Sequence, residues 1–452
     1  MEKENTNYPR VLIQSGQPRG FRGSTIASLY EIAQVYPVIL LSEELDSETE
    51  KLLHDKKLFP KLEKIIPYRQ FTGAGANPLF KNSYKHYKLA KKVIEEYKPD
   101  IILAGDTYLL QLYLGRFAKK LKPVIHFATQ GTLFVDPKDS RLRAYLLSAY
   151  LRTPSFLPFF LRMFLVKCRK LFAHFIYYWI LPLMIGEKPF LGKSSAILWT
   201  GAAGIRSCDY FLVYSRKDVD LAIKAGVLPE KVYILPPPLA REKTKQFFEK
   251  TFFSNSIKEY KSKEKTVTIM YSGDEIGFKK NNHSLISKQE MEKTLLDIVN
   301  SVSKTLEGWK IFVKPHPDTQ NMEDLKQKVE SVSPNITVTN PSDSADKYIE
   351  ISDVIIGPSP ASTTLFTASL QSKDKIILSL DFDEELCGDL FENSEGIEYI
   401  KDEGKFLSVL KEIKEGRFSR QKEKEKSVAI ETKEFSSIIE ALEYFMRLQK
   451  HD

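Results

Sequence analysis

Two short apolar runs in the second half of the chain each stop abruptly at a small polar cluster. Residues 311–313 are predicted as a buried strand that runs into KPHP at 314–317, and residues 354–356 as a strand that runs into GPSP at 357–360. In an open α/β sheet, ligands bind outside the carboxyl ends of the strands. Because one cluster carries Lys and His and the other Ser and Thr, we expect them to hold one phosphate-bearing ligand between them.

The second cluster has the pattern of a helix N-terminus. Ser359 is a good N-cap and Pro360 then falls at the first helical position, so the next amides are free to bind an anion. Lys314 adds positive charge, and His316 is expected to donate a hydrogen bond from a backbone restricted by its flanking prolines. The residues expected to bind the ligand are Lys314, His316, Pro317, Ser359, Ser362, Thr363 and Thr364. The alternative is a capped helix and an unrelated surface His-Pro turn.

Strand–loop–helix alternation predicts an α/β fold of two doubly wound, Rossmann-like domains. A chain of 452 residues is also too long for one core. We expect a first domain at 8–238, a linker at 239–265, a second domain at 266–425 and a closing helix at 426–452. The expected strands are 8–15, 36–41, 100–104, 124–127, 210–214, 266–271, 311–313, 354–356 and 375–380. The expected helices are 25–33, 84–97, 217–225, 289–306, 406–415 and 431–448.

Positive charge is concentrated in a segment that interrupts the first domain at residues 138–200. The net charge of the chain is +8, and residues 138–193 carry ten Lys or Arg against two acidic residues. The uncharged run at 171–186 is shorter than the about 20 apolar residues that a spanning helix needs. Basic residues beside aromatic ones are typical of a helix lying on an anionic membrane. We therefore expect a basic, apolar helical insertion with peripheral membrane contact; a buried insertion with solvent-facing basic residues is the alternative.

Other features narrow the class of protein. Three widely spaced cysteines predict neither a disulfide framework nor a zinc site and fit a reducing cytosol. The polar start MEKENTNYPR predicts no secretory signal, so a cytoplasmic location is expected, on the inner face of the membrane if the insertion binds lipid. No nucleic-acid-binding motif accompanies the basic segment, so no nucleic-acid partner is expected.

Three stretches of the chain resemble glycosyltransferases of the GT-B fold. They are KPHP, SDVIIGPSPASTT and, at the end of the first domain, DYFLVYSRKDVDLAIKAGVLPEKVYILPPP. The similarity is to bacterial surface-polysaccharide enzymes: capsule polymerases, sialyltransferases and poly(glycerol phosphate) transferases. In these, a His-Pro motif and a downstream Ser/Thr motif bind the donor nucleotide and phosphate, which implies that role for His316, Pro317 and the Ser and Thr residues at 359–364. The chain departs from the family pattern at Gln130, which stands in place of the His of a His-Gly pair.

Sugar transfer needs a base for the acceptor hydroxyl and groups that stabilise the leaving phosphate. Asp106, at the end of a first-domain strand, is the first candidate for the base, with a helix N-cap as the alternative. Asp274 and Glu275 are the next catalytic candidates, with an exposed acidic turn as the alternative. The DFD sequence at 381–383 fits an acidic metal-binding pattern, but the resemblance implies a metal-independent enzyme. We expect no metal and no cofactor.

The leading expectation is a glycosyltransferase that moves a sugar from a nucleotide-sugar donor to a surface-polysaccharide or lipid-linked glycan acceptor, with inversion and without metal. Two alternatives remain open. One is a nucleotide-sugar epimerase or a glycerol-phosphate transferase on the same fold. The other is a non-catalytic nucleotide-binding scaffold subunit.

Overall fold

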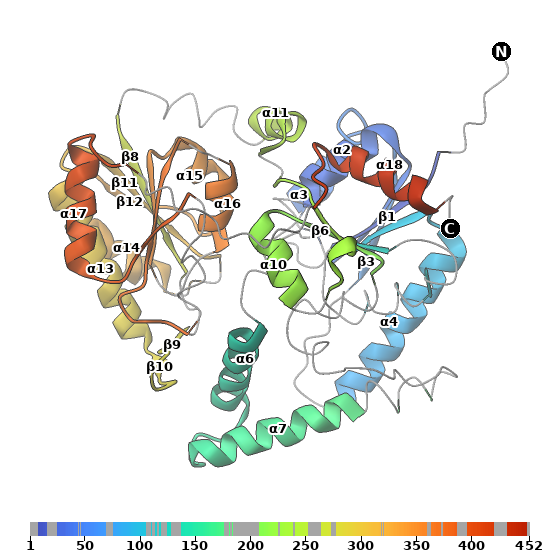
Figure 1. Ribbon diagram of the computed structural model, residues 1–452, viewed down its shortest axis with the longest axis horizontal. Coiled ribbons are helices and arrows are strands. Elements are labelled where there is room, and N and C mark those ends of the chain that lie inside the picture. The colour runs from blue at the N-terminus through green and yellow to red at the C-terminus, as the bar shows by residue number, and fades with distance from the viewer. Residues whose placement is uncertain are drawn as a thin grey trace. The chain divides into compact units, whose positions relative to one another are not determined.

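The computed structural model divides into two compact units (Figure 1). The first comprises Met1–Lys245 and Val428–Asp452, and the second Gln246–Ser427. The structure describes residues 8–15, 25–43, 45, 47–68, 76–104, 110, 114, 117–118, 124–127, 137–175, 180, 183, 208–224, 227–237, 240–251, 264–272, 277–317, 319, 321–358, 363–371, 374–386, 396–419 and 432–449.

The first unit is built on a seven-stranded parallel sheet with the strand order β3-β2-β1-β4-β5-β6-β7. Its strands are β1 (Val11–Ser15), β2 (Val38–Glu43), β3 (Leu62–Tyr68), β4 (Ile101–Ala104), β5 (Val124–Phe127), β6 (Tyr210–Val213) and β7 (Val232–Ile234). Its helices include α2 (Ile26–Val35), α3 (Ser47–Leu53), α4 (Ala76–Tyr97), α6 (Pro137–Arg152), α7 (Phe159–Phe175), α10 (Arg216–Lys224) and α18 (Ile438–Gln449). Helix α11 (Glu242–Thr251) spans the boundary between the units.

The second unit repeats this plan with a six-stranded parallel sheet in the order β12-β11-β8-β13-β14-β15. Its strands are β8 (Thr266–Tyr271), β11 (Lys310–Pro315), β12 (Ile336–Val338), β13 (Val354–Pro358), β14 (Ile376–Leu380) and β15 (Glu398–Ile400), with a small antiparallel pair, β9 (Gly277–Phe278) and β10 (Leu285–Ile286). Its helices are α13 (Lys288–Thr305), α14 (Met322–Glu330), α15 (Ala345–Ile351), α16 (Thr363–Gln371) and α17 (Glu403–Lys414). Both sheets place their first strand centrally, as in Rossmann folds.

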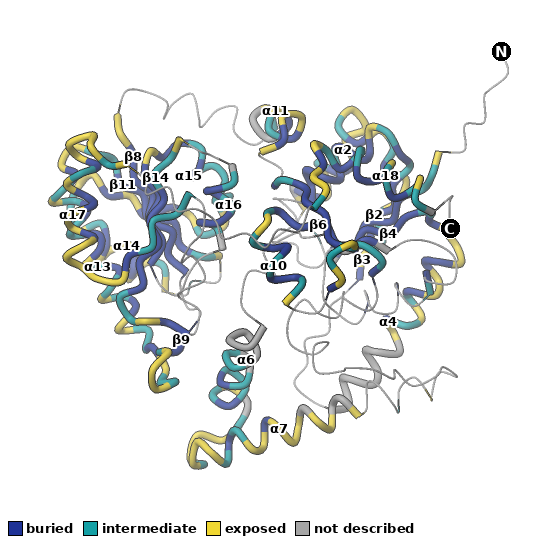
Figure 2. The backbone as a smooth tube through the Cα atoms, viewed as in Figure 1, coloured by how far each residue is buried: buried dark blue, intermediate teal, exposed yellow. Residues whose placement is uncertain are grey.

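The predicted α/β fold of two Rossmann-like sheets is therefore confirmed, as is a helical insertion, which the described residues show as α6 and α7. The predicted strands were found because buried parallel strands are continuously apolar. All six residues of β8 are buried, and Figure 2 shows the central strands buried between more exposed helices. Helix α11 lies inside the stretch 239–265 that composition predicts as a linker.

Helix α13 shows how local sequence sets an element of the second unit. Ser287 caps its start by accepting a hydrogen bond from the Glu290 amide, and the Glu290 side chain accepts one from the Ser287 amide. This capping box satisfies two amides that the helix leaves unpaired. The buried face recurs at helical spacing and consists of Met291, Leu295, Ile298, Val299 and Val302.

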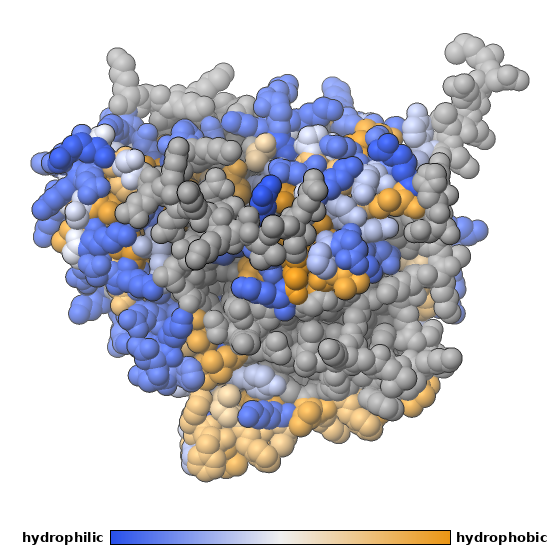
Figure 3. Space-filling model, viewed as in Figure 1, coloured by the Kyte–Doolittle hydropathy of each residue, from blue (hydrophilic) through white to orange (hydrophobic). Residues whose placement is uncertain are grey.

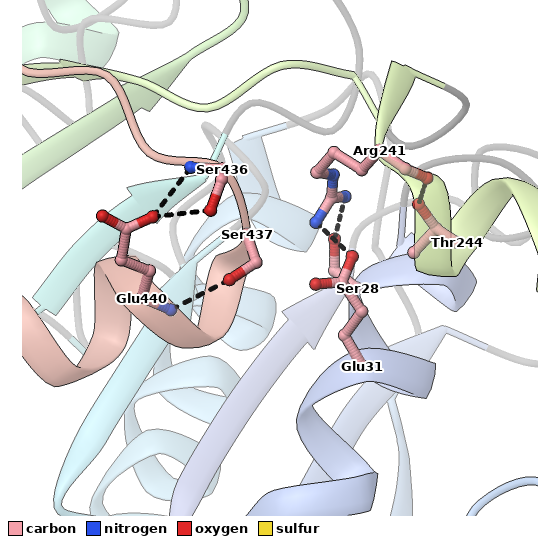
Figure 4. Close-up of polar contacts among 7 residues, drawn as sticks. All are labelled: Ser28, Glu31, Arg241, Thr244, Ser436, Ser437 and Glu440. Atoms are coloured by element: carbon pink, nitrogen blue, oxygen red, sulfur yellow. Dashed lines mark hydrogen bonds and ion pairs between the residues drawn. The ribbon is translucent and has the colours of Figure 1, made fainter.

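A buried ion pair holds two distant segments on helix α2. Glu31 of α2 accepts a 2.5 Å hydrogen bond from Nη1 of Arg241, and Ser28 lies 3.3 Å from Nη2 of the same guanidinium (Figure 4). Burial raises the pKa of Glu31, while Arg241 and the amide of Ile438 counteract that rise. Glu31 thus contacts Arg241, which lies just before the chain enters the second unit, and the start of α18, where the chain is again part of the first unit.

Helix α18 is fixed at its start and by the backbone that precedes it. The Glu440 carboxylate accepts hydrogen bonds from the amide and hydroxyl of Ser436, and the Ser437 hydroxyl accepts one from the Glu440 amide (Figure 4). The backbone before the helix pairs with the edge strand β7, through hydrogen bonds between Phe435 and Ile234 and between Ile234 and Lys433. This pairing covers an otherwise open sheet edge.

We predict that breaking the Glu31–Arg241 pair costs more than losing both members. Arg241→Met leaves a buried carboxylate without its cation, and we expect a loss of about 3–5 kcal/mol in the free energy of unfolding. In the double variant Glu31→Met/Arg241→Met most of that loss should be recovered. Urea denaturation measures both. The control Lys328→Met, which breaks exposed pairs with Asp324 and Glu292, should cost far less than Arg241→Met. Equal losses in the single and double variants would contradict this account.

Candidate functional site

Strand register brings the two polar clusters of the second unit to one edge of its sheet. Strand β8 lies between β11 and β13, and all three are parallel. Pro315 pairs with Tyr271, and Ile356 pairs with Ile269. His316 and the residues after Pro358 therefore follow strands that lie two spacings apart, about 10 Å. The chain crosses to opposite sides of β8 at this point, which is where ligands bind in doubly wound sheets.

The backbone of His316 is fixed on both sides. Its amide donates a 2.8 Å hydrogen bond to the carbonyl of Tyr271, and its carbonyl accepts one of 3.0 Å from the Thr319 amide. The preceding carbonyl, of Pro315, accepts a 2.6 Å hydrogen bond from Lys314 Nζ. His316 is half-buried and Pro317 is exposed. The imidazole is therefore presented from a turn anchored to β8.

Lys314 does more than add a charge at this edge. Its side chain is buried, and Nζ donates to the Pro315 carbonyl and, at 3.0 Å, to the Pro341 carbonyl. An ammonium has three donors, so these two bonds leave one for a ligand. Burial lowers the pKa of Lys314 to about 8, and the nearby Asp343 carboxylate opposes that decrease. Lys314 thus ties the turn that presents His316 to the end of β12.

A close approach positions the helix that follows β13. Leu365 of α16 is fully buried, and a Cβ placed on Gly357 would lie 2.5 Å from Leu365 Cδ1 and 2.8 Å from its Cγ. Only glycine lets α16 sit directly on the strand. The start of α16 is thereby held at the carboxyl edge, where helix amides attract anions.

Several predicted site residues lie outside the part of the chain that the structure describes. These are Asp106, Asp274, Glu275, Ser359 and Ser362. Thr363 is the first residue of α16, and Thr364 beside it is half-buried. The described candidates belong to β11 and β13, which flank β8, or follow these strands at the same edge; they are Lys314, His316, Pro317, Thr363 and Thr364. Their contact with a ligand stays a prediction.

The acidic pair of the DFD sequence has structural partners. Asp381 is buried and accepts hydrogen bonds from the Glu385 amide at 2.9 Å and the Tyr399 hydroxyl at 2.6 Å. Burial raises the pKa of Asp383. Within the described ranges, no group of three or more His, Cys, Asp or Glu side chains is placed to hold a metal ion.

The first unit has a buried polar cluster that sequence analysis did not identify. Gln14 and Ser15 end β1, Tyr68 ends β3, and His86 lies on α4 with its ring edge-on to Tyr68. Gln14 Nε2 donates to the Tyr68 hydroxyl, which donates to the Ser15 carbonyl. The Gln14 Oε1 atom is buried and has no hydrogen-bond partner among the described residues. The sequence feature that could have identified this cluster is a lone Gln at the end of the apolar run VLIQ.

A hollow of about 280 Å³ lies at the opposite, amino edge of the second sheet. Its walls include Lys265, Trp309, Asp353 and Lys375. These groups have partners in the protein: Asp353 accepts from the Thr266 amide, and Lys375 Nζ donates to the Glu350 and Ser352 carbonyls. This hollow is therefore distinct from the candidate site.

Comparison with solved structures finds similarity along nearly the whole chain. UDP-N-acetylglucosamine 2-epimerase from Rickettsia bellii matches with a TM-score of 0.52 and 13% identity, covering 98% of this chain and 95% of that one. The enzyme from Methanocaldococcus jannaschii matches with a TM-score of 0.52 and 12% identity over 98% and 100%. The Neisseria meningitidis enzyme, solved with UDP-GlcNAc bound, matches with a TM-score of 0.51 and 13% identity over 98% and 100%. No family model and no curated protein matches the chain.

These similarities establish the GT-B-like fold and correct one expectation. The leading prediction of a glycosyltransferase is wrong: three solved structures that match over 98% of the chain are UDP-N-acetylglucosamine 2-epimerases. The resemblance to surface-polysaccharide transferases extends to the shared fold only. The error has a physical origin: a His-Pro turn and a Ser/Thr helix start indicate how a phosphate is held, and they do not determine which bond of the sugar reacts.

We predict that Gly357→Ala displaces α16. The added methyl must push a fully buried leucine, so we expect a loss of about 1–3 kcal/mol in the free energy of unfolding. In a Leu365→Ala background the same change should cost much less, because the space is then available. A double-mutant cycle followed by urea denaturation measures this coupling. Additive losses would show that the close approach is not what constrains this position.

We predict that Lys314 makes stability depend on pH. Its folded pKa of about 8 lies below the ordinary value of 10.5, so between these values the unfolded chain binds more protons. The free energy of unfolding therefore rises with pH in this window, by at most about 3 kcal/mol. Lys314→Met should lack this rise, whereas Lys411→Met, at an exposed helix position, should keep it. Identical urea profiles for wild type and Lys314→Met from about pH 8 to about pH 10 would refute the shift.

Proposed function

We propose that this chain is an epimerase of a nucleoside-diphosphate sugar, with UDP-N-acetylglucosamine as the first candidate substrate. The observation that carries the proposal is the match along 98% of the chain to solved UDP-GlcNAc 2-epimerases, one of them bound to UDP-GlcNAc. The polar carboxyl edge of the second sheet supports it, because this edge suits a diphosphate.

In this proposal the nucleotide diphosphate binds at the ends of β11, β8 and β13. The amides at the N-terminus of α16 and the hydroxyls of Thr363 and Thr364 would donate hydrogen bonds to phosphate oxygens. His316 would donate a hydrogen bond from its anchored turn. Lys314 would act chiefly by holding that turn, with one remaining donor directed to the ligand. Pro317 would restrict the backbone, and Ser359 and Ser362 would complete the helix start.

Epimerisation places a different demand on the catalytic groups than sugar transfer does. The C–H bond at the inverted carbon breaks, a base takes the proton, and a proton is returned to the opposite face of the same carbon. Substrate and product have the same composition, so no acceptor is consumed. Asp274 and Glu275, which come after β8 in the chain, are the proposed acid–base groups, and Asp106 is the further candidate.

We predict that the purified protein converts UDP-GlcNAc to its 2-epimer without any acceptor. In D₂O the returned proton is a deuteron, so both product and recovered substrate should lose the proton NMR signal of carbon 2. His316→Ala should slow this exchange by about 10²–10³-fold, the usual cost of removing one positioned hydrogen-bond donor to a developing charge. His54→Ala, an exposed histidine after α3, is the matched control and should react like wild type.

The outcomes separate the remaining possibilities. Exchange at carbon 2 that His316→Ala abolishes supports the proposal. Binding of UDP that raises the melting temperature, with no exchange, would contradict the epimerase and favour nucleotide binding without catalysis. Absence of both binding and exchange would remove the nucleotide-sugar assignment altogether.

A further inference from the structure

Helices α6 and α7 form a hairpin in which one arginine joins α7 to the end of α6. Arg162 of α7 is buried, although it lies on a helix with many exposed residues. Its Nε donates to the Ala149 carbonyl at 3.1 Å and to Thr153 Oγ1 at 3.0 Å, and its Nη2 donates to the Tyr150 carbonyl at 3.1 Å. These acceptors end α6, where free carbonyls and the helix dipole favour a cation. The hairpin therefore holds α7 in a defined rotation about its axis.

The opposite face of α7 is an exposed apolar stripe. A helix turns about 100° per residue, so positions spaced by four, seven and four fall on one side. The stripe consists of Phe160, Phe164, Leu171 and Phe175. It lies opposite Arg162 and Val166, which are buried, and Phe160 is 74% and Leu171 70% exposed. Figure 3 shows this stretch as a continuous orange band over α7, and Figure 2 shows it exposed.

Basic side chains accompany the stripe. Lys167 is exposed and falls on the same side of α7 as the stripe, whereas the exposed Arg169, seven residues after Arg162, falls on the opposite side. They belong to the segment 138–193, which has ten basic and two acidic residues. Exposed aromatic residues beside Lys and Arg match the two layers of an anionic bilayer surface, the acyl boundary and the headgroups. A second copy of this face would bring like charges together, so charge complementarity favours lipid over self-association.

We propose that α7 lies in the plane of an anionic lipid bilayer, with the stripe in the acyl–headgroup boundary and the Lys167 side chain extended to the headgroups. None of the helices in the described part of the chain is long and apolar enough to cross a membrane. An in-plane helix therefore fits where a spanning one does not. This inference goes beyond the proposed function and is independent of it, because lipid binding is measured without substrate.

The test is vesicle flotation of the full chain. We expect binding to phosphatidylcholine vesicles that contain about 30 mol% phosphatidylglycerol and little binding to phosphatidylcholine alone. Phe160→Ser/Phe164→Ser should lower the partition coefficient at least about tenfold, because the variant lacks two rings that the bilayer would bury. Lys167→Glu should lower it about fivefold or more, the usual contribution of one basic residue near an anionic surface. The matched control Leu407→Ser/Lys411→Glu, at exposed positions of α17, should bind like wild type.

A fluorescent label gives a second readout that does not depend on the variants folding. Cys168 is exposed on α7 and Cys208 is buried, so Cys387→Ser leaves one reactive thiol. An environment-sensitive dye on Cys168 should shift to shorter wavelength with anionic vesicles and not with neutral ones. No shift, equal binding to neutral vesicles, or wild-type binding by the phenylalanine variant would each overturn the proposal. A concentration-dependent dimer that this variant abolishes, without vesicle binding, would assign the stripe to a second copy and also overturn it.

Discussion

The hydrogen bond from the His316 amide to the Tyr271 carbonyl fixes the candidate site, because it joins the turn after β11 to the end of the central strand β8. Parallel register then determines the rest. With β8 between β11 and β13, the His-Pro turn and the start of α16 must lie at one edge, about two strand spacings apart. The buried Lys314 ammonium secures the same turn through the Pro315 carbonyl.

Both units bury polar groups at the carboxyl edges of their sheets, which lowers the free energy of unfolding. The second unit buries an ammonium whose pKa falls to about 8, and the first buries the Gln14 amide with one oxygen unpartnered among the described residues. Buried polar groups of this kind cost free energy unless they are fully paired, and they gather at functional sites. By contrast, the polar groups around the amino-edge hollow of the second unit, such as Asp353 and Lys375, are paired.

Much of the fold could be predicted from sequence, because buried parallel strands such as 266–271 and 354–358 are continuous apolar runs. Helix α11 was missed, because its Lys/Glu-rich composition is typical of a solvated linker. Among the α11 residues whose burial is described, only Thr244 and Phe247 are buried. The Arg241–Glu31 pair and the carbonyl partners of Lys314 were also beyond reach, because they join residues distant in sequence or depend on turn geometry. The reaction was mispredicted because the phosphate-binding pattern is compatible with more than one chemistry on this fold.

The central claim is that a nucleoside-diphosphate sugar binds at the carboxyl edge of the second sheet. A crystal structure of the full chain with UDP tests it most directly. The account predicts that the diphosphate lies within hydrogen-bond distance of the first amides of α16 and of the His316 side chain. UDP bound anywhere else, for example at the Gln14–Tyr68 cluster or in the amino-edge hollow, would contradict it.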